Sequence, residues 1–244
     1  MNHIGYHHII GLMKFFSCRE YAEDLLKGTF YCHESGWFRK LEDSYRGDMN
    51  DGKRPFDITG LEIQIGKIKG IGSGVMRKGF DGDNKLPIYS LTTINRHILE
   101  KTNNEYTFKS DFLQKMSQFG EYVVLLTNRD KVMSDVYAHA KANSLVLTEC
   151  HVSYVDIFEE YDIHEKASRS LKAFFYKDKK YEYQNEFRIM WQHMNGLPLI
   201  DKSNDFVKIE LGHPLDGVLL HISQLLKVCL VSNKLGQWRL KEIR

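Results

Sequence analysis

Short apolar stretches separated by turn residues follow one another along most of this chain and predict many strands. In residues 61–65, three apolar side chains alternate with two polar ones, as a half-buried strand requires. The segment EYVVLLT at residues 121–127 contains a continuous apolar run bounded by Gly120 and Asn128, which is typical of a central strand. Further strands are predicted over residues 14–16, 29–33, 86–94, 145–155, 206–211 and 217–222.

Helical spacing marks fewer segments. In residues 130–142, apolar residues recur at every fourth position, so they share one face of a helix. Near the N-terminus, Ser17 is expected to cap a helix that Gly28 ends, because serine accepts the first backbone N–H groups and glycine tolerates the left-handed turn after a helix. Further helices are predicted over residues 111–119, 162–175 and 223–228, the last of them capped by Ser223.

The order of these elements predicts the fold class. Strands outnumber helices and do not alternate with them regularly, which favours an α+β fold with mixed, largely antiparallel sheets and flanking helices. The chain has no internal repeat and four prolines, so no linker divides it. We therefore expect residues 1–244 to form a single domain, with residues 1–12 as a frayed N-terminal extension.

Composition excludes several classes of protein. No stretch is apolar over the eighteen or so residues that a membrane span needs, and the first residues lack the pattern of a secretion signal, so we expect a cytoplasmic protein that does not contact membranes. The four cysteines are scattered without zinc spacing, and we expect neither a disulfide framework nor a bound metal. A formal net charge of +2 gives no general attraction to nucleic acid.

Two polar segments are candidates for binding. The stretch WFRKLEDSYRGDMNDG at residues 37–52 brings aromatic, basic and acidic side chains together in a turn-rich region, which is either a binding loop or a surface loop fixed by its aromatic residues. The glycine-rich GIGSG at residues 70–74 lacks the Lys-Ser/Thr of a phosphate-binding loop. It is therefore interpreted as a hairpin connection.

The strongest candidate for a site is the predicted strand YEYQNEFRIMW at residues 181–191. Alternation puts its aromatic and aliphatic residues on one face. The opposite face presents four consecutive polar positions, Glu182, Gln184, Glu186 and Arg188. Such a face is either a solvated, ion-paired sheet surface or the floor of a cleft.

The triplet QNE within this strand resembles the Gln/Glu-x-Glu signature of ADP-ribosyltransferases. The resemblance implies an ADP-ribosyltransferase-like fold, NAD as the substrate, and two catalytic residues. Glu186 would stabilise the positive charge that develops on the nicotinamide ribose, and Gln184 would orient the acceptor. A carboxylate aimed at developing positive charge acts mainly on the transition state.

The same resemblance implies residues that bind the dinucleotide. An early imidazole or guanidinium would hold NAD, and His33, Arg39 and Arg46 are the candidates. A middle strand would support the nicotinamide, and here Tyr89, Ser90 and Thr92 are the candidates, although the family's Ser-Thr-Ser pattern is absent. Arg188, on the strand of Glu186, completes the expected cofactor-binding set.

A broader resemblance runs over most of the chain. The "strand, helix ending LLKG, strand" opening, a GD-rich turn, PIYSLT, FGEYVVLL and the closing YEYQNEFRI occur in the same order in a family of uncharacterised bacterial and phage proteins, some linked to abortive infection. This resemblance implies a role in conflict between phages and bacteria.

Three functions are therefore open. The first is an NAD-dependent ADP-ribosyltransferase-like protein that modifies a protein or nucleic-acid acceptor or hydrolyses NAD. The second is a non-catalytic phage or bacterial protein that binds a nucleotide signal or a host defence protein. The third, a metal-dependent nuclease, requires at least two carboxylates that converge on a metal.

Overall fold

The computed structural model of the protein describes residues 10–41, 48–57, 59–78, 85–103, 105–156, 171–195, 199–200, 204–233 and 238–243. Within these residues, helices combine with strands that pair almost entirely in antiparallel fashion, which confirms the predicted α+β class. In the same part of the chain, no helix is long and apolar enough to cross a membrane.

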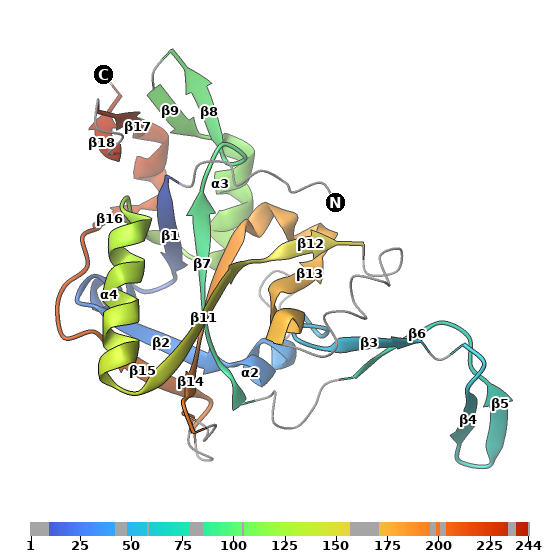
Figure 1. Ribbon diagram of the computed structural model, residues 1–244. Helices are drawn as coiled ribbons and strands as arrows, with labels where there is room; N and C mark the ends of the chain where they lie inside the picture. Colours follow the sequence, from blue (N-terminus) through green and yellow to red (C-terminus); the bar gives the residue numbers. More distant parts are fainter. Residues whose placement is uncertain are drawn as a thin grey trace.

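An eight-stranded antiparallel sheet forms the centre of the described structure (Figure 1). Six of its strands follow the order β11-β14-β7-β1-β10-β16, and β2 joins through β7 and carries β15 on its other edge. The strands are β1 (Gly11–Phe16), β2 (Thr29–Glu34), β7 (Pro87–Ile94), β10 (Tyr122–Leu126), β11 (Leu145–His151), β14 (Glu186–His193), β15 (Phe206–Glu210) and β16 (Val218–His221).

The long strand β7 is the branch point of this sheet. One edge of β7 pairs with β14. The other edge pairs with β1 as far as Thr92, opposite Met13, and with β2 from Ile88, opposite His33. Since neither partner reaches residues 89–91 on that edge, β1 and β2 diverge beside them. We call this gap the strand split.

Helices cover both faces of the sheet. On one face, α1 (Arg19–Leu26) and α4 (Arg129–Ala142) pack against a core that includes Tyr89 and Trp191. Val132, Val136 and Ala140 of α4 are buried, as their helical spacing predicted. On the other face, α3 (Ser110–Met116) contributes to a second core with residues of β1 and β10.

Smaller units surround the main sheet. Strands β8 (Leu99–Thr102), β9 (Glu105–Phe108), β17 (Val228–Ser232) and β18 (Trp238–Glu242) form a four-stranded sheet, and β12 (Ser153–Val155) pairs in parallel with β13 (Tyr176–Asp178). The chain also forms helix α2 (Ser35–Lys40) and the 3-10 helices η2 (Ser117–Phe119), η3 (Leu171–Phe175), η4 (Lys179–Gln184) and η5 (Ile222–Lys227).

A ribbon made of two antiparallel strand pairs projects away from the main sheet (Figure 1). Strands β3 (Arg54–Asp57) and β6 (Val75–Lys78) form its base, and β4 (Glu62–Ile65) and β5 (Ile68–Ile71) form its tip. The strand predicted at residues 61–65 is present as β4, but the predicted half-burial is wrong, because Leu61 is 54% exposed and Ile65 is 75% exposed. The glycine-rich segment at residues 70–74 leads from β5 back to β6.

Several predicted boundaries also differ. Helix α1 begins after Cys18, which makes no side-chain cap, so Ser17 is not its cap. Helix η5 is capped by His221, which accepts the N–H of Ser223. Of the expected N-terminal extension, residues 1–9 lie outside the described residues, whereas residues 10–12 are buried and reach into β1. Residues 162–170 of the helix expected at residues 162–175 are likewise outside the described part, and residues 171–175 form the 3-10 helix η3.

Candidate functional site

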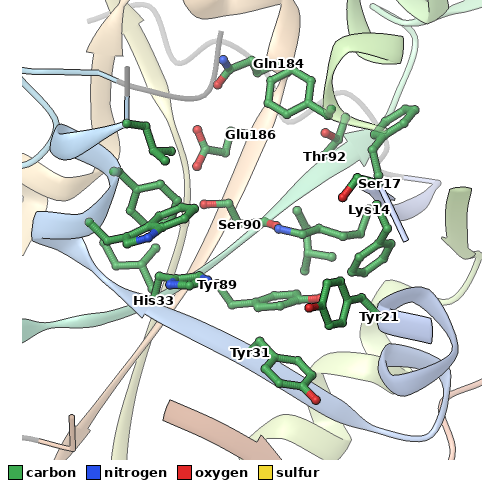
Figure 2. Close-up of a pocket in the computed structure, with 18 of the residues that line it drawn as sticks. Lys14, Ser17, Tyr21, Tyr31, His33, Tyr89, Ser90, Thr92, Gln184 and Glu186 are labelled. Carbon is green, nitrogen blue, oxygen red and sulfur yellow. The ribbon is translucent and has the colours of Figure 1, made fainter. Parts of the chain in front are cut away.

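A cavity of about 440 Å³ lies at the strand split. Figure 2 shows Glu186 and Gln184 at one end, Tyr21 and Tyr31 at the other end, and Ser90 between them. The split explains why a cavity forms here, since the side chains of two diverging strands cannot fill the space above and below the uncovered edge of β7.

The strand that carries Glu186 begins later than its sequence indicates. Residues 179–184 form the 3-10 helix η4, and Asn185 then has a φ of 45° in the left-handed region. Asparagine tolerates this conformation better than most residues. Its Nδ2 donates to the carbonyl oxygen of Thr93 at 2.7 Å, which ties the turn to β7. Strand β14 therefore starts at Glu186, and Gln184 lies before it.

The side chains of Gln184 and Glu186 nevertheless accept hydrogen bonds from the same lysine. Lys177 of β13 donates from Nζ to Oε1 of Gln184 at 2.8 Å and to Oε2 of Glu186 at 2.9 Å. Arg188 donates from Nε to the other oxygen of Glu186 at 2.7 Å. The side chain of Glu186 is 7% exposed and that of Arg188 is 1% exposed, so a solvated polar face is the wrong interpretation of this strand.

The backbone of Glu186 is held as firmly as its side chain. Its N–H donates to the hydroxyl of Tyr154 at 2.8 Å, and its carbonyl oxygen accepts the N–H of Val152 at 2.9 Å. Burial alone would raise the pKa of Glu186, but the charges of Arg188 and Lys177 hold that pKa well below its usual range. The carboxylate is therefore a fixed anion on the cavity wall.

Arg188 belongs to the interior rather than to the cavity. Its Nη1 and Nη2 donate to the two carboxylate oxygens of Asp51 at 2.7 and 2.6 Å, and Nη1 also donates to the carbonyl oxygen of Phe174. Arg39 donates to the carbonyl oxygen of Asp51 at 2.7 Å. Neither arginine lines the cavity, in contrast to the cofactor-binding role expected for both. The third candidate, Arg46, lies outside the described residues.

His33, Tyr89 and Ser90 do line the cavity, as their expected roles require. His33 stacks on Trp37 with ring centroids 3.9 Å apart and an angle of 15° between the planes. Burial lowers the pKa of His33, so the imidazole is neutral at pH 7. Phe206 lies 5.9 Å from His33 between ring centroids and continues this aromatic wall.

Two lysines at the cavity were missed by the sequence analysis. Lys14 of β1 donates from Nζ to the carbonyl oxygen of Ser90 at 2.5 Å and lies 4.6 Å from the centroid of the Tyr89 ring. Lys177 reaches the cavity from β13. A possible signal for Lys14 was its position between buried apolar residues of one strand. Lys177 follows an apolar run and precedes the QNE segment, and nothing local indicates its partner.

No group of three or more His, Cys, Asp and Glu side chains that could hold a metal occurs among the described residues. Of the acidic residues in the turn-rich segment, Asp51 is paired with Arg188. Asp48 accepts the backbone N–H of Asn50 at 2.9 Å. The described part of the chain therefore contains no metal site of the kind that a metal-dependent nuclease would need.

Comparisons of this chain with protein-family models, with curated proteins and with solved structures find no match.

Proposed function

We propose that this protein binds NAD in the cavity at the strand split and cleaves the bond between nicotinamide and ribose, in the manner of an ADP-ribosyltransferase or NAD glycohydrolase. The observation that carries the proposal is the buried carboxylate of Glu186, paired with Lys177 and Arg188, on the wall of an aromatic cavity. A cavity of about 440 Å³ falls within the range of small-molecule sites.

The lining of the cavity suits a nucleotide. The His33–Trp37 stack, Tyr31 and Phe206 offer flat aromatic surfaces against which a base or nicotinamide ring can stack. The ammonium group of Lys14 lies beside the uncovered edge of β7 and can neutralise a phosphate. A ligand with planar rings and a charged centre therefore matches both kinds of lining.

In the proposed reaction, the C–N bond between nicotinamide and ribose breaks, and nicotinamide leaves with the bonding electron pair. Positive charge then develops on the ribose, and the Glu186 carboxylate stabilises it. An acceptor hydroxyl or amine, or water, forms the new bond to ribose carbon and releases its proton to solvent. Gln184, 2.8 Å from Lys177, lines the same end and would orient that acceptor.

One observation favours a second candidate, a protein that binds the nucleotide without cleaving it. Lys177 and Arg188 occupy both carboxylate oxygens of Glu186, and two nearby positive charges weaken the attraction of this carboxylate for a cationic ribose. The binding surface would remain, and the protein would sequester or sense a nucleotide. Either activity is compatible with the proposed role in phage–bacterium conflict.

The test is the release of nicotinamide from NAD by purified protein, with cell extract present as a source of acceptors. In the variant Glu186→Gln, the buried cations Lys177 and Arg188 lose one of their two carboxylate partners, and this unbalanced charge could unfold the protein. The double variant Glu186→Gln/Lys177→Met removes one cation together with the anion, so it is measured beside the single variant. The control is Glu182→Gln, because Glu182 is exposed.

Release by the wild type and by Glu182→Gln, but not by a folded double variant, is the expected result. If the wild type releases no nicotinamide, catalysis is ruled out for this nucleotide. Calorimetric titration with ADP-ribose then decides the second candidate, since binding without turnover supports it and the absence of binding removes both.

A further inference from the structure

Lys177 reaches Glu186 from outside the main sheet. It lies on β13, which pairs with β12 in a separate two-stranded unit. Its side chain is 5% exposed, and its Nζ is 2.9 Å from Oε2 of Glu186. Lysine is rarely buried without a partner. Lys177 therefore links the two-stranded unit to the Glu186 carboxylate of the main sheet.

Arg188 alone does not balance the charge of Glu186, because its own charge is shared with Asp51. Its two terminal nitrogens pair with both oxygens of Asp51, and only Nε makes a short bond to Glu186. The buried pair of Arg188 and Asp51 is already neutral. Lys177 is thus the second positive charge beside Glu186, and without it two carboxylates, Asp51 and Glu186, would share the single charge of Arg188.

We propose that Lys177 is the positioning residue of the cavity, which keeps the Glu186 carboxylate ionised and fixes it in one orientation. The importance of this role for function rests on the proposed function, in which Glu186 meets the ligand as an anion. A buried carboxylate that loses its cation takes up a proton in preference to remaining charged. Without Lys177, Glu186 would therefore carry a proton over part of the ordinary pH range.

The other groups around Glu186 do not replace Lys177. Tyr154, on β12, has its pKa raised by burial and by the Glu186 charge, so it stays neutral. Among the described residues, Lys177 and Arg188 are the cations within ion-pair distance of Glu186. The remaining polar or charged groups that face this cluster are Ser90 on β7, Gln184 and Glu182 on η4, and Asp48 and Asp51 in the turn-rich segment.

The experiment compares Lys177→Met with Lys177→Arg and with Lys180→Met. Lys180 is a matched control, because it lies 4.9 Å from the Tyr181 ring that Lys177 also approaches at 5.2 Å, yet it is exposed and is not bonded to Glu186. Lys177→Gln serves as a second neutral variant if Lys177→Met does not fold. The direct readout is the titration of the Glu186 carboxyl carbon by carbon-13 NMR, assigned with the double variant Glu186→Gln/Lys177→Met.

We expect no titration of Glu186 between pH 4 and pH 8 in the wild type, in Lys177→Arg and in Lys180→Met, and a titration within this range in Lys177→Met or Lys177→Gln. An unchanged Glu186 signal in a folded neutral variant would overturn the inference. Nicotinamide release is measured in parallel, and in the neutral variants it should fall about tenfold for each pH unit below the new pKa.

The two proposals can fail separately. If the wild type neither binds nor cleaves NAD, the proposed function is wrong, and the NMR titration still decides whether Lys177 controls the ionisation of Glu186. If the wild type releases nicotinamide, and the neutral variants release it with the same flat dependence on pH as the wild type, the positioning role is wrong and the proposed function stands.

Discussion

The Asp51 carboxylate and the Arg188 guanidinium form a two-bond ion pair, with N–O distances of 2.7 and 2.6 Å, across 137 residues of chain. Both side chains are 1% exposed. The pair joins the turn-rich segment to the QNEFRI strand, which are two of the segments that the sequence analysis singled out. Their polar residues are therefore explained in part by their contact with each other.

Removal of one member of this pair should destabilise the fold strongly. In Asp51→Ala the Arg188 charge stays buried without its main partner, and we expect a loss of about 3–5 kcal/mol in the free energy of unfolding. Urea unfolding measures the change. Glu23→Ala, which breaks the exposed Arg19–Glu23 pair, is the control and should cost no more than about 1 kcal/mol. Equal losses in the two variants would contradict the buried role of Asp51.

Gly52, next to this ion pair, should not tolerate alanine. It has a φ of +66°, and an added Cβ would overlap the ring of Phe174. Gly60→Ala is a matched control, because Gly60 has a φ of +83° but no atom of the described residues lies within 4 Å of its added Cβ. We expect Gly60→Ala to cost about 1–2 kcal/mol from backbone strain. In thermal unfolding, Gly52→Ala should cost about 1–3 kcal/mol more from overpacking, and equal costs would exclude the Phe174 contact.

Asp48 should make stability depend on pH in the opposite direction from a paired carboxylate. Burial, followed by the nearby charge of Asp51, raises the pKa of Asp48 above its ordinary value. The folded state therefore retains the Asp48 proton at a pH where the unfolded chain has lost it, so this residue lowers stability as pH rises through that interval. Asp48→Asn keeps an oxygen that can accept the N–H of Asn50. The unfolding free energy of Asp48→Asn minus that of the wild type should therefore increase from pH 4 to pH 7. A decrease of this difference over the same range would contradict the raised pKa of Asp48.

Trp37 should contribute to nucleotide affinity through ring stacking. It lines the cavity and stacks on His33, whereas Trp238 packs against Tyr106 in the four-stranded sheet. Stacking of a base on an aromatic ring contributes about 1–3 kcal/mol, which corresponds to roughly 5- to 150-fold in affinity. In calorimetric titrations with ADP-ribose, Trp37→Leu should weaken binding by this factor and Trp238→Leu should leave it unchanged. The same affinity for both variants would place the ring of the ligand elsewhere.

Elements with a strong local pattern could be predicted from the sequence. The continuous apolar run of β10 and the helical spacing of α4 correspond to segments buried by the core of the sheet. The alternation at residues 61–65 led to a wrong prediction of burial. An alternating pattern indicates a two-faced ribbon, but it does not reveal whether another layer covers the apolar face, and none of the described residues does so here.

The candidate site was only partly accessible to sequence reasoning. Glu186 and Gln184 were found through a local motif, and both line the cavity. The start of β14 was misplaced because the left-handed Asn185 and its bond to Thr93 interrupt a pattern that otherwise looks like one strand. Lys177 could not be identified, because its significance lies in a contact with another element rather than in its neighbours along the chain.

The position of β14 between β7 and β11 has a consequence for the synthesis of the protein. The ribosome completes β7 and β11 before residues 186–193 emerge, so for some seconds both strands lack the partner that later joins them. The nascent chain thus passes through a stage with open backbone edges, to which chaperones or other chains can bind. The sheet can close after translation has passed the QNEFRI segment, and a polypeptide truncated before it would be a substrate for quality-control proteases.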